Sequence, residues 1–230
     1  MNEVAEQATG GGMDQLIGAA RALLVRQVKE WGEILLGFEA RNRFEIFDAT
    51  GRTVGFAAEE SGGFGTVILR NLFGRLRAAV VHIYEPAGRQ VARCVKPFRF
   101  YFHRVDIFEG EQRIGAVERR FSIFHRLFDV EDADGRALCR IRSPWLRIWT
   151  FKLLVEGQEV GRISKKWGGL LREMFTDADT FGVEFTHPEL PAELKKLLLG
   201  ATFLVDFTCF ENNQGSRSPW NILDALMRSG

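Results

Sequence analysis

The sequence predicts a mostly β fold, in which a barrel of antiparallel strands closes around the protein's own C-terminal helix. Short β-rich segments recur between residues 38 and 185, with glycine-containing turns between them. A later segment, residues 197–210, is apolar on nearly every side, as expected of a helix that is buried all round. With 230 residues, 46% of them hydrophobic and 27% charged, the chain can bury a substantial core.

Five hairpins account for about ten strands. In each hairpin a β-rich run leads into a turn that contains glycine and then into a second β-rich run. The turns lie at residues 48–51, 85–88, 109–110, 132–135 and 156–157. Strands that follow one another at spacings of about 8–12 residues are typical of an all-β sandwich or barrel.

Helices are expected before and after this β region. Apolar residues at steps of three and four predict an amphipathic helix over residues 13–36, which either packs on the domain or serves a membrane surface or a partner. Pro191 suits a first helical turn, and residues 192–210 contain no proline, so a second helix is expected there. The domain would then cover residues 13–211, between tails at 1–12 and 212–230.

Membrane-spanning and secretory signals are not found in the sequence. The longest apolar run has fourteen residues, 197–210, and is interrupted by Asp206, whereas a spanning helix needs about 20. The polar, acidic residues 1–12 do not resemble a secretory signal. The cysteines Cys94, Cys139 and Cys209 are scattered and form no disulfide or zinc pattern. We therefore expect a reducing, intracellular compartment.

The net charge of +1 conceals three charged blocks. Residues 61–105 carry eight basic residues and one acid, residues 137–172 carry eight basic residues and two acids, and residues 173–193 carry six acids and no basic residue. The basic blocks are typical of a surface that binds lipid phosphates, and the acidic block is typical of a cation site. The alternative is a set of solvated strand faces whose charges cancel in the folded protein.

The basic blocks are interleaved with aromatic residues, namely Phe98, Phe100, Tyr101, Phe102, Trp145 and Trp149. Such mixtures stack nucleobases in some nucleic-acid-binding proteins. Their alternation here favours core positions for most of them, and no RNA-recognition motif or zinc finger is present. The near-zero net charge also argues against a dedicated nucleic-acid-binding protein.

Residues 177–182 begin like a calcium-binding loop. Asp177 and Asp179 stand at the first and third positions, and Gly182 stands at the sixth, where a sharp turn is needed. The later positions do not fit, because Pro188 occupies the twelfth. Asp177, Asp179 and Glu184 are the candidate calcium ligands, and turn-forming Asp side chains are the alternative.

No catalytic motif is apparent. The four histidines are not in an H-E-x-x-H pattern, and the chain has neither a G-x-S-x-G elbow nor a phosphate-binding loop with Lys-Ser/Thr. The motifs therefore give no reason to expect an enzyme.

Several blocks of the sequence resemble the phospholipid scramblase family. They are GFEARNRFEI at 37–46, FAAEE at 56–60, GRISKKW at 161–167, LREMFTDADTFGV at 171–183 and LGATFLVDF at 199–207. The resemblance covers about residues 13–211 in the family's order and is weak over 96–150.

The resemblance implies a tubby-like barrel of about twelve strands around a buried C-terminal helix. It also implies calcium-stimulated, ATP-independent movement of phospholipids between leaflets, with the calcium segment at 177–188. The implied partner is an anionic phospholipid membrane. Its expected ligands are the basic residues Arg70, Arg75, Arg77, Lys165, Lys166 and Arg172.

A second function stays open, that of a tubby-like module that binds anionic lipids or proteins without scrambling. A C-terminal helix enclosed in the barrel favours the binding module, whereas an exposed helix favours a membrane-spanning role. The cysteine cluster that carries lipid anchors in animal members of the family is absent from the corresponding residues 61–72. We expect a cytoplasmic protein, or one peripheral on the cytoplasmic face of a membrane.

Overall fold

The computed structural model describes residues 12–17, 20–28, 40–60, 78–147, 149–165, 167, 180–187 and 189–210. The strands are β1 (Ala22–Val28), β2 (Ala40–Asp48), β3 (Thr53–Glu60), β4 (Ala79–Tyr84), β5 (Gln90–Lys96), β6 (Arg104–Glu109), β7 (Gln112–Arg120), β8 (His125–Asp132), β9 (Ala137–Pro144), β10 (Thr150–Val155), β11 (Gln158–Ser164) and β12 (Thr180–Phe185). The helices are α1 (Gly12–Ile17) and α4 (Ala192–Val205), and α4 continues into the π-helical turn η3 (Asp206–Phe210).

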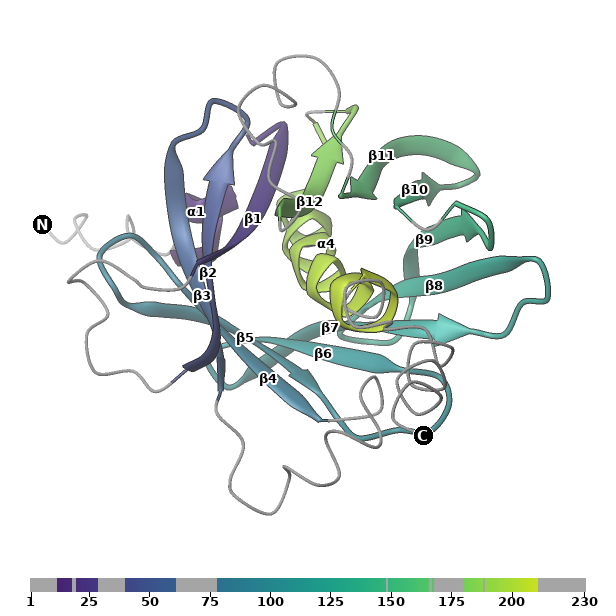
Figure 1. Ribbon diagram of the computed structural model, residues 1–230, viewed down its shortest axis with the longest axis horizontal. Coiled ribbons are helices and arrows are strands. Elements are labelled where there is room, and N and C mark those ends of the chain that lie inside the picture. The colour runs from purple at the N-terminus through teal and green to yellow at the C-terminus, as the bar shows by residue number, and fades with distance from the viewer. Residues whose placement is uncertain are drawn as a thin grey trace, which may run out of the picture.

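The twelve strands form one closed barrel, which confirms the predicted fold (Figure 1). Each strand pairs antiparallel with the next along the chain, and β1 closes the ring by pairing with β12. In this closing pair Leu24 lies opposite Gly182, and Val25 lies opposite Phe181. Closure leaves the barrel without the unpaired edge strands that an open sheet would expose.

The five predicted hairpins are all present, and three of their turns share one construction. In the β2–β3 turn the N–H of Asp48 donates to the carbonyl of Arg52 at 3.0 Å, and the N–H of Gly51 donates back to Asp48 at 3.1 Å. The same two bonds form in the β4–β5 and β8–β9 turns. The glycine has a φ of 82–86° in all three, a conformation that favours residues without a Cβ.

The predicted N-terminal helix over 13–36 is wrong in its extent. Residues 12–17 are helical, but residues 22–28 form strand β1. Leu23 and Val25 belong to the main core, while Ala22 and Leu24 pack with Phe47 and Trp167 in a second cluster. Because both faces of β1 are buried, its apolar residues do not alternate with polar ones, and the run also fits a helical pattern.

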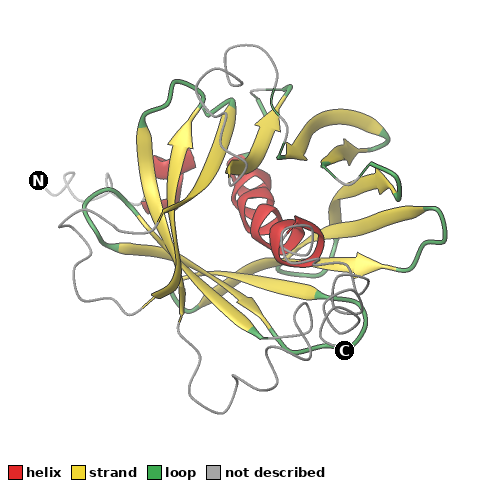
Figure 2. Cartoon of the chain, viewed as in Figure 1, coloured by secondary structure: helices red, strands yellow, loops and turns green. Residues whose placement is uncertain are grey.

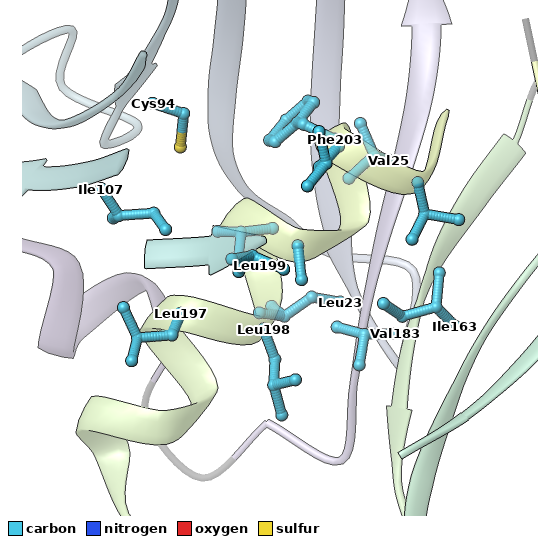
Figure 3. Close-up of a cluster of buried hydrophobic side chains, with 14 of the residues drawn as sticks. Leu23, Val25, Cys94, Ile107, Ile163, Val183, Leu197, Leu198, Leu199 and Phe203 are labelled. Carbon is cyan, nitrogen blue, oxygen red and sulfur yellow. The ribbon is translucent and has the colours of Figure 1, made fainter. Parts of the chain in front are cut away.

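Helix α4 lies inside the ring of strands, as predicted (Figure 2). Every residue from 194 to 210 is buried, and Leu197, Leu198 and Phe203 lie among buried side chains of the strands (Figure 3). The Phe203 ring packs against Phe44 of β2 and Phe181 of β12, at 5.6 and 5.9 Å between ring centroids. Gly115 of β7 allows a close approach, because a Cβ there would lie 2.7 Å from a methyl carbon of Leu197. Within the described residues, no helix combines the length and apolar character needed to cross a membrane.

Candidate functional site

The two ends of the barrel differ in their connections. Because the strands alternate in direction, the tight turns after β2, β4, β6, β8 and β10 gather at one end, which we call the hairpin end. The described connections β5–β6, β7–β8 and β9–β10 gather at the other, which we call the loop end. Helix α4 enters at the hairpin end, and its last turn reaches the loop end, where Phe210 stacks on Trp149 of the β9–β10 connection at 6.1 Å between ring centroids.

An ion cluster joins α1, β6 and α4 at the hairpin end. The Lys196 ammonium, whose side chain is 3% exposed, lies 3.0 Å from a carboxylate oxygen of Asp14, 3.0 Å from Glu109 and 3.2 Å from Glu193. Burial by itself would lower the pKa of Lys196, but the hydrogen bonds that its ammonium donates to these three carboxylates together raise the pKa above its ordinary value. The cluster therefore holds the start of the axial helix against α1 and β6 through the charged Lys196 side chain.

A second buried ion pair lies near the loop end. The Lys165 ammonium is 3.3 Å from Asp206 Oδ1 and lies over the rings of Phe181 and Phe210, at 5.7 and 5.4 Å from their centroids. The two charged side chains are 8% and 10% exposed. The structure thus places Lys165, an expected lipid ligand, in contact with the end of the axial helix.

Most of the other expected site residues lie outside the described part of the chain. These are Arg70, Arg75, Arg77, Lys166, Arg172, Asp177 and Asp179. Glu184, the third expected calcium ligand, is on β12, where its Oε2 accepts a hydrogen bond from Arg162 Nε at 2.8 Å and forms an ion pair with Arg162 Nη2 at 2.7 Å.

The described residues therefore offer no assembled calcium site. Within that part of the chain no three His, Cys, Asp or Glu side chains are grouped as metal ligands would be. Glu184 alone does not fit one, because calcium takes six to eight oxygen ligands and the Arg162 guanidinium already neutralises its charge.

A groove of about 500 Å³ runs along the outer face of β8, β9 and β10, from Ser122 at the loop end to Glu156 at the hairpin end. Arg140 in this groove is held by Asp129, with Nε 2.9 Å from Oδ1. Arg142 has no carboxylate partner among the described residues, and its Nη2 lies 2.8 Å from His125 Nε2. A guanidinium beside an imidazole suits an anion with several oxygens, such as a phosphate.

The expectation that most of the interleaved aromatic residues are core residues is wrong. Five of the six are exposed, from 41% for Trp145 to 80% for Tyr101, and Trp149 alone is partly covered. The alternation around Phe98, Phe100 and Phe102 resembles a strand pattern, yet these residues form the β5–β6 loop, where no neighbouring strand covers them.

Comparison with known proteins identifies relatives over most of the chain. Residues 7–212 match the family model described as Scramblase. Phospholipid scramblase 2 of Bos taurus is 31% identical over 208 residues, which cover 84% of this chain and 69% of the relative. Phospholipid scramblase 1 of Mus musculus is 32% identical over 213 residues, which cover 85% of this chain and 63% of the relative. The chain thus spans about two thirds of the length of these relatives, and no solved structure matches it.

Proposed function

The chain belongs to the scramblase family, and we propose on that ground that it moves phospholipids between the two leaflets of a membrane. The movement is stimulated by calcium and uses no ATP. The observation that carries the proposal is the match over residues 7–212 together with relatives whose names state phospholipid scrambling. The protein acts from the cytoplasmic face of the membrane, as a peripheral protein on anionic phospholipids.

Reconstituted liposomes test the translocation. A fluorescent phospholipid is placed in both leaflets, a membrane-impermeant reductant bleaches the outer leaflet, and the bleached fraction reports exchange from the inner leaflet. With the protein present, we expect the bleached fraction to pass the half that is reached without exchange, and to do so faster as calcium is titrated in. Bleaching that stays at the protein-free level across the calcium titration would overturn the translocation proposal.

The proposed stimulation by calcium depends on Asp177 and Asp179 as ligands, because the Glu184 carboxylate is paired with Arg162. Carboxylates at the first and third positions of a loop can converge on one cation. In the same liposomes, we expect the Asp177→Asn/Asp179→Asn variant to lose the calcium response. Glu184→Gln is the matched control, expected to keep it. A calcium response that survives in the double variant would show that the ligands lie elsewhere.

The enclosed axial helix supports a second candidate, an anionic-lipid-binding module that does not translocate lipid. All of residues 194–210 are buried inside the barrel, so the helix offers no apolar surface to a bilayer in this conformation. Lipid phosphates would be bound by basic residues of the two positive blocks, among them Arg70, Arg75, Arg77, Lys166 and Arg172. Binding to anionic vesicles that weakens with salt, with no lipid exchange, would favour this function. Equal binding to neutral vesicles would contradict it.

A further inference from the structure

Every exposed large hydrophobic side chain in the described part of the chain lies in one of three loops. The residues and their exposed fractions are Phe98 43%, Phe100 60%, Tyr101 80%, Phe102 48%, Phe121 77%, Ile123 70%, Phe124 75%, Trp145 41% and Leu146 95%. They belong to the β5–β6, β7–β8 and β9–β10 connections. Single exposed apolar residues are common on proteins, but gathered exposed apolar residues mark a site of interaction.

The three loops lie together at the loop end. Trp145 donates its backbone N–H to the carbonyl of Phe124 at 3.3 Å, which joins the β9–β10 loop to the β7–β8 loop. The N–H of Arg119, on β7, donates to the carbonyl of His103 at 2.8 Å, which joins β7 to the β5–β6 loop. The guanidinium groups of Arg119 and Arg126 lie 5.8 and 5.2 Å from the Trp145 ring centroid. The exposed side chains therefore form one surface rather than three separate tips.

Positive charge surrounds this surface. Residues 97–103, 121–128 and 141–150 contain four arginines and two histidines, and no Asp or Glu. Arg99 pairs with Glu118 at 3.1 Å, whereas Arg126, Arg142 and Arg147 form no ion pair with a carboxylate within the described residues. By contrast Arg89 and Arg136, in hairpin-end turns, are bonded to Glu85 and to Asp134. Three arginines without a carboxylate partner in the described part of the chain thus lie beside the exposed aromatic residues.

We propose that the loop end docks on an anionic phospholipid bilayer, with the aromatic and aliphatic loop residues inserted between headgroups and the arginines bound to lipid phosphates. The proposal rests on the proposed membrane function and adds the surface that performs it. We define the docking surface as residues 98–102, 121–124 and 145–147.

The composition of the docking surface favours a bilayer over a soluble partner. Aromatic rings and aliphatic tips on protruding loops suit the interface between headgroups and acyl chains, where amphipathic rings are enriched. Arginine between such residues binds phosphate bidentately, and each basic residue near an anionic surface adds electrostatic attraction. The groove with Arg142 and His125 opens beside the same loops, within reach of a headgroup.

Site-directed labelling tests the depth of insertion. The three native cysteines are buried, and burial raises the pKa of the Cys94 and Cys139 thiols to about 12, so an introduced exposed cysteine is labelled selectively. An environment-sensitive dye is attached at Leu146→Cys on the docking surface or, as the matched control, at Ala87→Cys in the β4–β5 turn of the hairpin end. With vesicles of three parts phosphatidylcholine to one part phosphatidylserine, we expect a blue shift and quenching by lipid-borne quenchers for the Leu146→Cys dye only.

Two sets of substitutions separate insertion from charge. Phe121→Ser/Phe124→Ser/Leu146→Ser removes exposed apolar surface, and we expect vesicle affinity to fall about tenfold or more with an unchanged thermal midpoint, since no core contact is lost. Arg142→Gln/Arg147→Gln should abolish most of the preference for anionic over neutral vesicles. Arg89→Gln/Arg136→Gln is the charge-matched control at the hairpin end and is expected to bind like the unsubstituted protein.

Four other results would each contradict a specific part of the docking proposal. If the protein binds anionic vesicles while the Leu146→Cys dye remains in water, the docking surface is wrong and the membrane function stands. If the protein binds no vesicle, both the docking surface and the proposed membrane function are wrong. If the dye shifts to the blue without lipid and the triple serine variant turns a dimer into a monomer in sedimentation, the surface joins two copies of the chain. If Arg142→Gln/Arg147→Gln and its control Arg89→Gln/Arg136→Gln lose vesicle binding equally, the effect comes from net charge and not from the docking surface.

Discussion

Asp48 shows how a single turn residue couples folding to pH. Burial by itself would raise the pKa of Asp48, but hydrogen bonds from the Thr50 hydroxyl at 2.6 Å and from the N–H groups of Thr50 and Arg52 at 2.8 and 3.1 Å lower it below its ordinary value. A depressed pKa in the folded state stabilises the fold above about pH 4, and this stabilisation is lost as the pH falls through the folded-state pKa.

Asp48→Ala is therefore expected to cost about 1 kcal/mol of unfolding free energy at pH 7, and less at pH 3. Urea denaturation at the two pH values measures both differences. Asp48→Asn is the control, because its amide oxygen still accepts the turn hydrogen bonds but does not titrate. A loss for Asp48→Ala that is equal at both pH values would show that the charge of Asp48 does not contribute.

Lys165 and Asp206 form a buried ion pair near the loop end. Removing one partner of a buried ion pair leaves the other charge uncompensated, at a cost of about 3 kcal/mol or more. We expect Lys165→Met to lower stability by about this amount in urea denaturation. Lys165→Met/Asp206→Asn should recover part of the loss. A double variant as unstable as the sum of the two single variants would show that the two residues are not coupled.

Close contacts between the barrel and the axial helix depend on glycines in two elements. A Cβ on Gly115 would lie 2.3 Å from the carbonyl oxygen of Glu131, a backbone atom that cannot move alone, and 2.7 Å from Leu197. A Cβ on Gly200 would lie 2.6 Å from a side-chain carbon of Ile107. Alanine is also preferred to glycine in a helix by about 1 kcal/mol, which offsets part of the clash at residue 200.

Gly115→Ala is thus expected to destabilise the protein by about 2–3 kcal/mol, and Gly200→Ala by clearly less. Thermal and urea unfolding of the two variants give the order. The reverse order would mean that the packing around Gly200 leaves less room for a methyl group than the packing around Gly115.

The elements that the sequence predicted correctly are those specified by local chemistry. The Asp48 and Asp132 side chains and the glycines that follow them define turns without help from the rest of the chain. Strand β1 was missed because its pairing with β2 on one side and with β12, more than 150 residues later in the sequence, on the other decides its conformation. The exposed aromatic loops were missed for a related reason: alternation separates two faces of a segment but does not say whether anything covers them. Phe102, with a φ of 51°, ends any strand there.

At the scale of the whole molecule, the axial helix and the barrel stabilise each other. Nine large apolar side chains of α4 and η3 are buried, and each stabilises the fold by about 1.5–3 kcal/mol relative to exposure to water. Withdrawal of the helix would therefore cost roughly 15–25 kcal/mol before any lipid contact, as much as or more than the 5–15 kcal/mol that stabilises a typical domain. The fourteen residues of α4 also span only about 21 Å, against a hydrocarbon core of about 30 Å.

A tether between α4 and the barrel tests whether the helix stays in place on a membrane. A Cβ at Gly200 would lie 3.5 Å from the Cys94 sulfur of β5, with Ile107 as the obstacle, so Gly200→Cys/Ile107→Ala offers a route to a disulfide. Burial raises the pKa of Cys94 to about 12, so the bond should be formed during oxidative refolding rather than in the native protein. We expect the oxidised and reduced forms of this variant to bind anionic vesicles equally, because the loop end meets the lipid while α4 stays enclosed. Vesicle binding or lipid exchange that is lost on oxidation and restored by reduction would show instead that the helix must leave the barrel to act.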